Sequence, residues 1–67
     1  MKFVKCTDGG EGYPILVPLN NVLIVFKEGD TTLPSSFYAW TINGNNKITQ
    51  RKYTAVGQNL ADSLVEI

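Results

Sequence analysis

The 67-residue chain contains no histidine and a single cysteine, Cys6. Histidine is the side chain most often used for general acid and base catalysis, and zinc sites are built from histidines and several cysteines. We therefore expect no enzyme, no catalytic residue, no metal ligand and no cofactor. A nucleophilic Cys6 would lack its usual histidine base, so we expect this residue to be a small packed side chain.

An excess of either charge is also missing, because six basic and six acidic residues cancel. A chain without net charge has no strong overall field to attract nucleic acid or an anionic membrane. Any electrostatic preference for a partner must therefore come from local groups.

Long apolar runs are absent as well. The longest, residues 22–26, is far shorter than the roughly 20 residues of a membrane helix. The N-terminal residues carry charges where a secretory signal needs its apolar stretch, and an unpaired cysteine fits a reducing compartment. We expect a cytoplasmic protein without a membrane segment.

The length and composition of the chain indicate one small folded domain. Hydrophobic residues make up 43% and charged residues 18%, which is ordinary for a folded chain and too apolar for a disordered one. Sixty-seven residues lie near the size below which a hydrophobic core becomes marginal. We therefore expect a single domain over residues 1–67.

Short β-type segments, separated by Gly, Asn and Pro, occupy most of this domain. The unbroken apolar run at 22–26 is typical of a strand covered on both faces, so it is predicted to lie in the middle of the sheet. Pro14 lacks an amide donor and should lie at a strand start or a sheet edge. Five strands are predicted in all, over residues 2–7, 13–17, 22–26, 36–42 and 47–56.

The C-terminal residues follow a different periodicity. Asn59 is a good helix N-cap, and apolar residues from Leu60 to Ile67 recur at helical spacing, so a short helix is predicted there. The predicted fold is mainly β: a small five-stranded antiparallel barrel or curled sheet with a short C-terminal helix.

Two loop features suggest ligands only superficially. The stretch Gly9-Gly10-Glu11-Gly12 resembles a phosphate-binding loop, but such loops lead into a helix, whereas another strand is predicted here. A simple turn is therefore expected. The acidic loop residues have no spacing of a known calcium loop and are expected to be solvated; they are Asp8, Glu11, Glu28 and Asp30.

Several short segments and turns follow one another in a recognisable order: Lys5-Cys6-Thr7, a Gly turn, Ile15-Leu16-Val17, Val22-Leu23-Ile24-Val25, Asn43-Gly44, Val56 and a terminal segment from Leu60 to Ile67. In this order the chain resembles the short flagellar and swarming-motility proteins of the FlbD type. The resemblance spans most of the chain and implies a small β domain without catalytic residues. Very short proteins of this kind are also common among phage-encoded host regulators.

The last hairpin is the strongest candidate for a binding site, and its loop length decides its register. A loop of two or four residues places aromatic and basic side chains on one face. A three-residue loop instead pairs Trp40 with Ile48 across the two strands, and the face that they share is then predicted to be part of the core. With the first register, the shared face holds Tyr38, Trp40, Ile42, Lys47, Thr49, Arg51 and Tyr53.

A cluster of aromatic and arginine side chains is typical of protein interfaces and needs no net charge. We therefore expect a non-catalytic protein-interaction module, a small regulator or inhibitor of a larger protein of phage or bacterial type. Its predicted binding residues are Tyr38, Trp40, Arg51, Tyr53 and Lys47.

Two alternatives remain open. Rings that stack bases beside cations that hold phosphates are the usual means of binding single-stranded nucleic acid, so the same face is an alternative nucleic-acid site. An exposed strand edge near Pro14 or Ser36 offers a second route, by strand addition or by formation of a homodimer.

Overall fold

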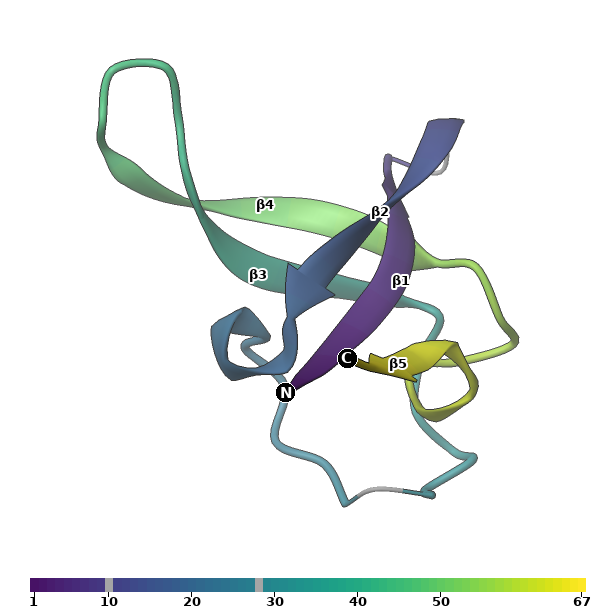
Figure 1. The fold of residues 1–67 in the computed structure, drawn as a ribbon. Helices are drawn as coiled ribbons and strands as arrows, with labels where there is room; N and C mark the ends of the chain where they lie inside the picture. The colour runs from purple at the N-terminus through teal and green to yellow at the C-terminus, as the bar shows by residue number, and fades with distance from the viewer. Residues whose placement is uncertain (10, 28) are drawn as a thin grey trace.

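The computed structural model describes residues 1–9, 11–27 and 29–67, with Glu11 described by its backbone alone. These residues form one antiparallel sheet that curls on itself without closing (Figure 1). The predicted mainly β fold and curled sheet are thus confirmed. The strands are β1 (Lys2–Asp8), β2 (Glu11–Pro18), β3 (Ser36–Ile42), β4 (Ile48–Ala55) and β5 (Leu64–Glu66).

The first strand, β1, lies at the centre of the sheet. One edge of β1 pairs with β2. Its other edge is shared, because β5 pairs with Lys2–Val4 and β4 pairs with Cys6–Asp8. β3 then pairs with β4, which gives the order β2-β1-β4-β3. The edge strands of this path are therefore β2 and β3.

The predicted central strand at 22–26 is wrong. In place of a strand, Val22 makes one isolated bridge with Ala39, and the Leu23 amide donates a hydrogen bond of 3.0 Å to the Tyr38 carbonyl. Side chains along this segment are alternately half-buried and exposed, and Val25 is 101% exposed. The segment crosses the edge of β3 with one side towards the core, and the central place in the sheet belongs to β1.

The predicted C-terminal helix is also wrong, although its cap is formed. The Asp62 amide donates a hydrogen bond of 2.9 Å to Asn59 Oδ1, but only a single 3₁₀ turn comes after it, η2 (Ala61–Ser63). Leu64 is already extended, with ψ of 135°. β5 instead pairs with the half of β1 that β4 does not reach, and these sheet hydrogen bonds outweigh the weak preference of a short segment for a helix.

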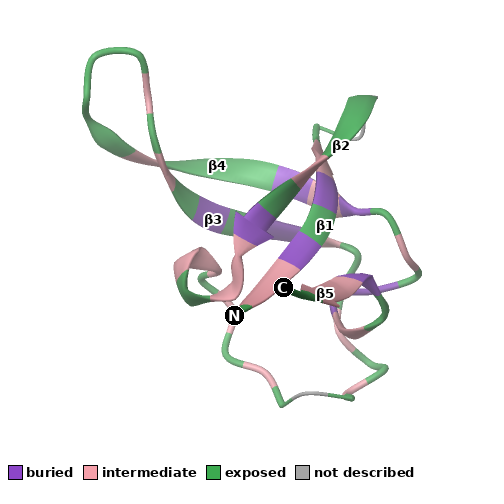
Figure 2. Ribbon diagram, viewed as in Figure 1, coloured by how far each residue is buried: buried purple, intermediate pink, exposed green. Residues whose placement is uncertain are grey.

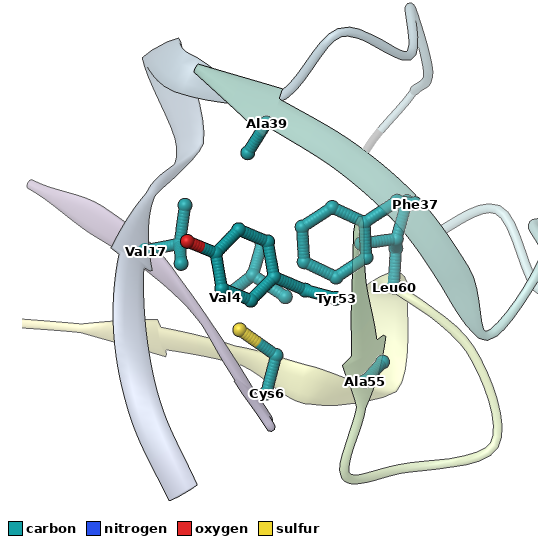
Figure 3. Close-up of a cluster of buried hydrophobic side chains, with 8 residues drawn as sticks. All are labelled: Val4, Cys6, Val17, Phe37, Ala39, Tyr53, Ala55 and Leu60. Carbon is teal, nitrogen blue, oxygen red and sulfur yellow. The ribbon is translucent and has the colours of Figure 1, made fainter. Parts of the chain in front are cut away.

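The core lies inside the curl of the sheet (Figures 2 and 3). The rings of Phe37 and Tyr53 pack with their centroids 5.9 Å apart. Small side chains fill the rest of the space where strands approach closely. The buried apolar residues are Val4, Cys6, Val17, Phe37, Ala39, Tyr53, Ala55 and Leu60.

Two predicted turns fall partly on residues outside the described part of the chain, namely Gly10 in the stretch 9–12 and Glu28 in the turn 27–30. Beside the second, the Asp30 carboxylate accepts hydrogen bonds from the amide and the hydroxyl of Thr32, at 2.9 and 2.7 Å. These bonds hold the pKa of Asp30 below its usual range. Within the described residues, no helix has both the length and the apolar character needed to cross a membrane.

Candidate functional site

The β3–β4 hairpin has a loop of odd length. Ile42 pairs with Ile48, so five residues, 43–47, separate the strands. Asn43 organises this loop: its side-chain oxygen accepts hydrogen bonds from the amides of Asn45 and Lys47, at 2.9 and 3.1 Å. Asn46 adopts a φ of 60°, which asparagine tolerates well. The asparagines thus stabilise a five-residue loop. The predicted binding face required a loop of two or four residues.

The odd loop divides the predicted binding residues between two faces. Tyr38 lies opposite Lys52, and Trp40 lies opposite Gln50. Because side chains alternate along a strand, Arg51 and Tyr53 belong to the other face. Tyr53 is only 6% exposed and packs in the core, so the predicted aromatic and basic cluster is not assembled as one surface.

The face that carries Trp40 is nevertheless not a core face. Phe37 and Ala39 occupy the core side of β3, which leaves the alternate residues outside. We call these outer residues the outer patch: Tyr38, Trp40, Ile42 and Ile48, which are 51%, 43%, 68% and 70% exposed. Ile48 was missed as a contact by sequence reasoning, because its place opposite Ile42 depends on the length of the loop.

An apolar groove of about 550 Å³ lies next to the outer patch. Residues 15–18 of β2 form one wall and residues 40–42 of β3 form the other, with Asn21, Ile48 and Tyr53 between them. The groove therefore occupies the gap between the two edge strands of the curled sheet. None of the residues that line it carries a charge.

The β2 wall of the groove is a modified strand edge. The Val56 amide donates a hydrogen bond of 3.1 Å to the Lys5 carbonyl. Because the backbone groups of successive residues point to opposite edges of a strand, the odd-numbered residues of β1 bond towards β4 and the even-numbered ones bond towards β2. With the β1–β2 register, the backbone groups that point away from the sheet belong to Pro14, Leu16 and Pro18. Two of these three residues have no amide hydrogen, so Leu16 is the outward donor within the described stretch 14–18, and the prolines limit strand addition.

The β3 wall is partly covered by the chain itself. The Leu23 amide already donates a hydrogen bond to the outward-pointing carbonyl of Tyr38. Because backbone groups alternate in direction along a strand, those of Ile42, four residues further on, also point outward. Near the predicted edge at Ser36, the Ser35 carbonyl accepts a hydrogen bond from the Ala55 amide. Residues 40–42 of this edge line the groove.

One polar group faces the groove from the core. The Tyr53 ring is buried, yet Tyr53 lines the groove, and Figure 3 shows its hydroxyl directed towards Val17 of β2. This hydroxyl makes no hydrogen bond with any residue in the described part of the chain.

The hairpin has a local positive charge despite the neutral composition. Residues 36–56 include Lys47, Arg51 and Lys52 and no acidic residue. Arg51 forms a two-point contact with Asp8, with nitrogen–oxygen distances of 2.8 and 3.2 Å. Lys47 and Lys52 form no ion pair with the residues that the structure describes, so two cationic groups remain available beside the outer patch.

Cys6 has no exposed surface. Burial, with a smaller effect of the nearby Asp8 carboxylate, raises the pKa of its thiol from 9.0 to about 11. The thiol is therefore protonated at neutral pH and inaccessible, which is the opposite of a reactive cysteine. Across residues 1–9, 11–27 and 29–67, no three His, Cys, Asp or Glu side chains come together as metal ligands would.

Comparisons with family models, with curated proteins and with solved structures yielded no match. The resemblance to FlbD-type proteins therefore stays a prediction. The candidate site rests on the outer patch and the groove.

Proposed function

We propose that this chain is a non-catalytic protein-binding module, a small regulator or inhibitor that docks on a larger protein through the outer patch. The observation that carries the proposal is the exposure of Trp40, Ile42 and Ile48 beside an uncharged groove. Exposed apolar side chains that adjoin one another are typical of interaction surfaces, and aromatic residues are enriched among those that contribute most to binding.

The proposed contacts differ from the predicted set by the addition of Ile42 and Ile48 and the removal of Arg51. Tyr38, Trp40 and Lys47 remain, and Ile42 and Ile48 join them. Arg51 is already paired with Asp8, and Tyr53 contributes from within the groove. The resemblance to FlbD-type proteins assigns a role to no residue, so it is consistent with this site without adding to it.

The experiment is quantitative capture of a partner from nuclease-treated bacterial extract. The wild-type protein is compared with the double variant Ile42→Ser/Ile48→Ser, whose substituted side chains are largely exposed and need not disturb the core. We expect the affinity for the captured protein to fall at least tenfold, because two apolar contacts are lost from the interface.

Val56→Ser is the matched control. Val56 is an exposed apolar residue, 47% accessible, and directly follows β4, whose C-terminal end lies far from the hairpin loop (Figure 1). Its variant should bind like the wild type. Unchanged binding by the double variant, with thermal unfolding similar to that of the wild type, would refute the proposed function.

A second candidate function is single-stranded nucleic-acid binding, because Tyr38 lies directly opposite Lys52 on the outer patch. Two unpaired lysines would give a slope of about −1.4 in a plot of log affinity against log salt concentration. The test is a titration with a dT oligonucleotide, in which binding is monitored by the fluorescence of Trp40. Salt-dependent quenching would favour this function, whereas our proposal predicts no quenching at physiological salt.

A further inference from the structure

We propose that the groove between β2 and β3 binds an extended apolar segment of the partner protein, with an acidic residue at the end that lies nearest the hairpin loop. This inference rests on the proposed function and specifies its partner. Three features of the groove support it, namely the two strand edges that form it, its apolar lining and the Tyr53 hydroxyl. The two unpaired lysines of the hairpin beside it support the acidic residue.

An extended segment fits because the groove is a gap in a sheet. Its walls are the outer edges of β2 and β3, and each presents backbone groups that point into the gap, at Leu16 and at Ile42. The chain itself already pairs in this way with the outer edge of β3, where the Leu23 amide donates a hydrogen bond to the Tyr38 carbonyl. A helix satisfies its own backbone groups internally and would leave those of the groove unpaired.

Side chains must supply most of the affinity. Pro14 and Pro18 remove two amide donors from the β2 edge, so only a short ladder of hydrogen bonds can form there. The apolar lining, including Val17, Trp40 and Ile48, matches apolar side chains on alternate residues of the segment.

The Tyr53 hydroxyl gives the groove one fixed polar contact. Its ring is held by the core against Phe37, so the hydroxyl position is set before any partner binds. An apolar occupant that excludes water from the groove would leave this donor unpaired, at a cost in free energy. A backbone carbonyl of an extended segment can accept the hydrogen bond.

Charge complementarity selects an acidic segment. The hairpin carries no acidic residue and Arg51 is already paired with Asp8, so its unpaired cations are Lys47, at the loop end, and Lys52, opposite Tyr38. Lys47 immediately precedes Ile48, a residue of the groove. An Asp or Glu beside the apolar residues would therefore meet a positive charge at the hairpin end of the groove.

The probe is a display library of linear random dodecapeptides, selected against the wild-type protein. We expect enriched peptides to carry apolar residues at positions i and i+2, flanked by Asp or Glu. Apolar residues at helical spacing, a basic flank, or no enrichment would overturn the inference.

Two variants then test the geometry with the best enriched peptide, by isothermal titration calorimetry. Tyr53→Phe removes only the hydroxyl and should weaken binding about three- to tenfold. Lys47→Ala/Lys52→Ala should weaken it by a similar factor and flatten its salt dependence, whereas Lys27→Ala, an exposed lysine outside the groove, should not. Full affinity in both test variants would refute the proposed mode of binding.

The β2 edge is tested by Leu16→Pro against Leu16→Ala. The Leu16 amide points away from β1, at a position equivalent to those of Pro14 and Pro18, so proline costs no bond within the sheet there. We expect proline to weaken peptide binding more than alanine. Equal effects of the two substitutions would exclude a hydrogen bond from the Leu16 amide to the segment.

Failure of this inference can be told apart from failure of the proposed function. If Ile42→Ser/Ile48→Ser abolishes partner capture while Tyr53→Phe and the lysine variant leave it intact, the interaction surface stands and the extended segment is wrong. A dimer in light scattering that Leu16→Pro dissociates would identify a second copy as the occupant and would also overturn the inference.

Discussion

Cys6 illustrates how burial at a single residue changes its chemistry. Its side chain lies within the cluster that includes Val4 and Tyr53 (Figure 3), and it has no exposed surface. The protonated thiol packs there as a small apolar group, whereas a thiolate would have to leave water without a cation to compensate it.

The raised pKa of Cys6 predicts a loss of stability in alkali. In the unfolded chain the thiol ionises near pH 9.0, but in the folded protein it does so near pH 11. Its contribution is therefore fully present below about pH 9 and is lost as the pH rises towards 11, by up to about 2 to 3 kcal/mol in the free energy of unfolding.

Urea unfolding of the wild type and of Cys6→Ala between pH 7 and pH 11 measures this contribution. Alanine removes the thiol, so the difference in stability between the two proteins should shrink or reverse as the pH rises. A constant difference over the whole range would show that the thiol does not titrate differently in the folded and unfolded states.

At the scale of an element, the C-terminal turn shows why a good cap does not ensure a helix. Ser63 receives a hydrogen bond of 2.8 Å from the Gly57 amide and donates one of 2.9 Å to the Asn59 carbonyl. The Asn59 side chain also donates to the Thr31 carbonyl at 3.1 Å. These contacts tie the turn to two other segments and direct the residues after it into β5.

Gly57→Ala tests this close contact. An added Cβ would lie 2.9 Å from Ser63 Oγ and 3.1 Å from Asp62 Cβ, and Ser63 is held in place by its hydrogen bonds. We expect a loss of about 1 to 3 kcal/mol in the free energy of unfolding, measured by urea denaturation.

Gly44→Ala provides the matched comparison. At that position in the hairpin loop a Cβ would meet no atom within 4 Å, so stability should stay within about 0.5 kcal/mol of the wild type. Equal stability of the two variants would mean that the contact between Gly57 and Ser63 is not close in solution.

At the scale of the whole molecule, one core is shared by strands that are distant in sequence. Val4 of β1, Phe37 of β3 and Leu60 before η2 meet inside the curl. Because these contacts are long-range, the strands depend on one another, and a domain of this size should unfold in one cooperative step.

Leu60→Ala tests that shared core. Leu60 is fully buried, so its truncation should cost about 2 to 5 kcal/mol, a large part of the roughly 3 to 10 kcal/mol expected for a chain of this length. Thermal unfolding followed by circular dichroism should show one transition at a much lower temperature.

The matched control is Val25→Ala. Val25 belongs to the most apolar run of the sequence but is fully exposed, so its truncation should change stability by less than about 0.5 kcal/mol. If Val25→Ala destabilised the protein as strongly as Leu60→Ala, residues 22–26 would have to contribute to the core as a central strand would.

Local patterns in the sequence were enough to predict four strands close to their observed positions and the turns around Asn43 and Gly44. Alternation and turn residues act over a few positions, so they can be read directly from the chain. They also predicted that Tyr38 and Trp40 belong to one face of β3, which the structure bears out.

Tertiary structure alone decided which strand lies at the centre, whether a helix or a strand forms after Asn59, and where Tyr53 points. Apolar content cannot distinguish residues 22–26 from β1 as the central strand, because pairing partners far along the chain decide that place. Residues 64–66 form a strand because β1 has an unpaired half edge there. The loop of residues 43–47 set the register that left Trp40 outside and Tyr53 within, since a shift of one residue moves every side chain to the opposite face.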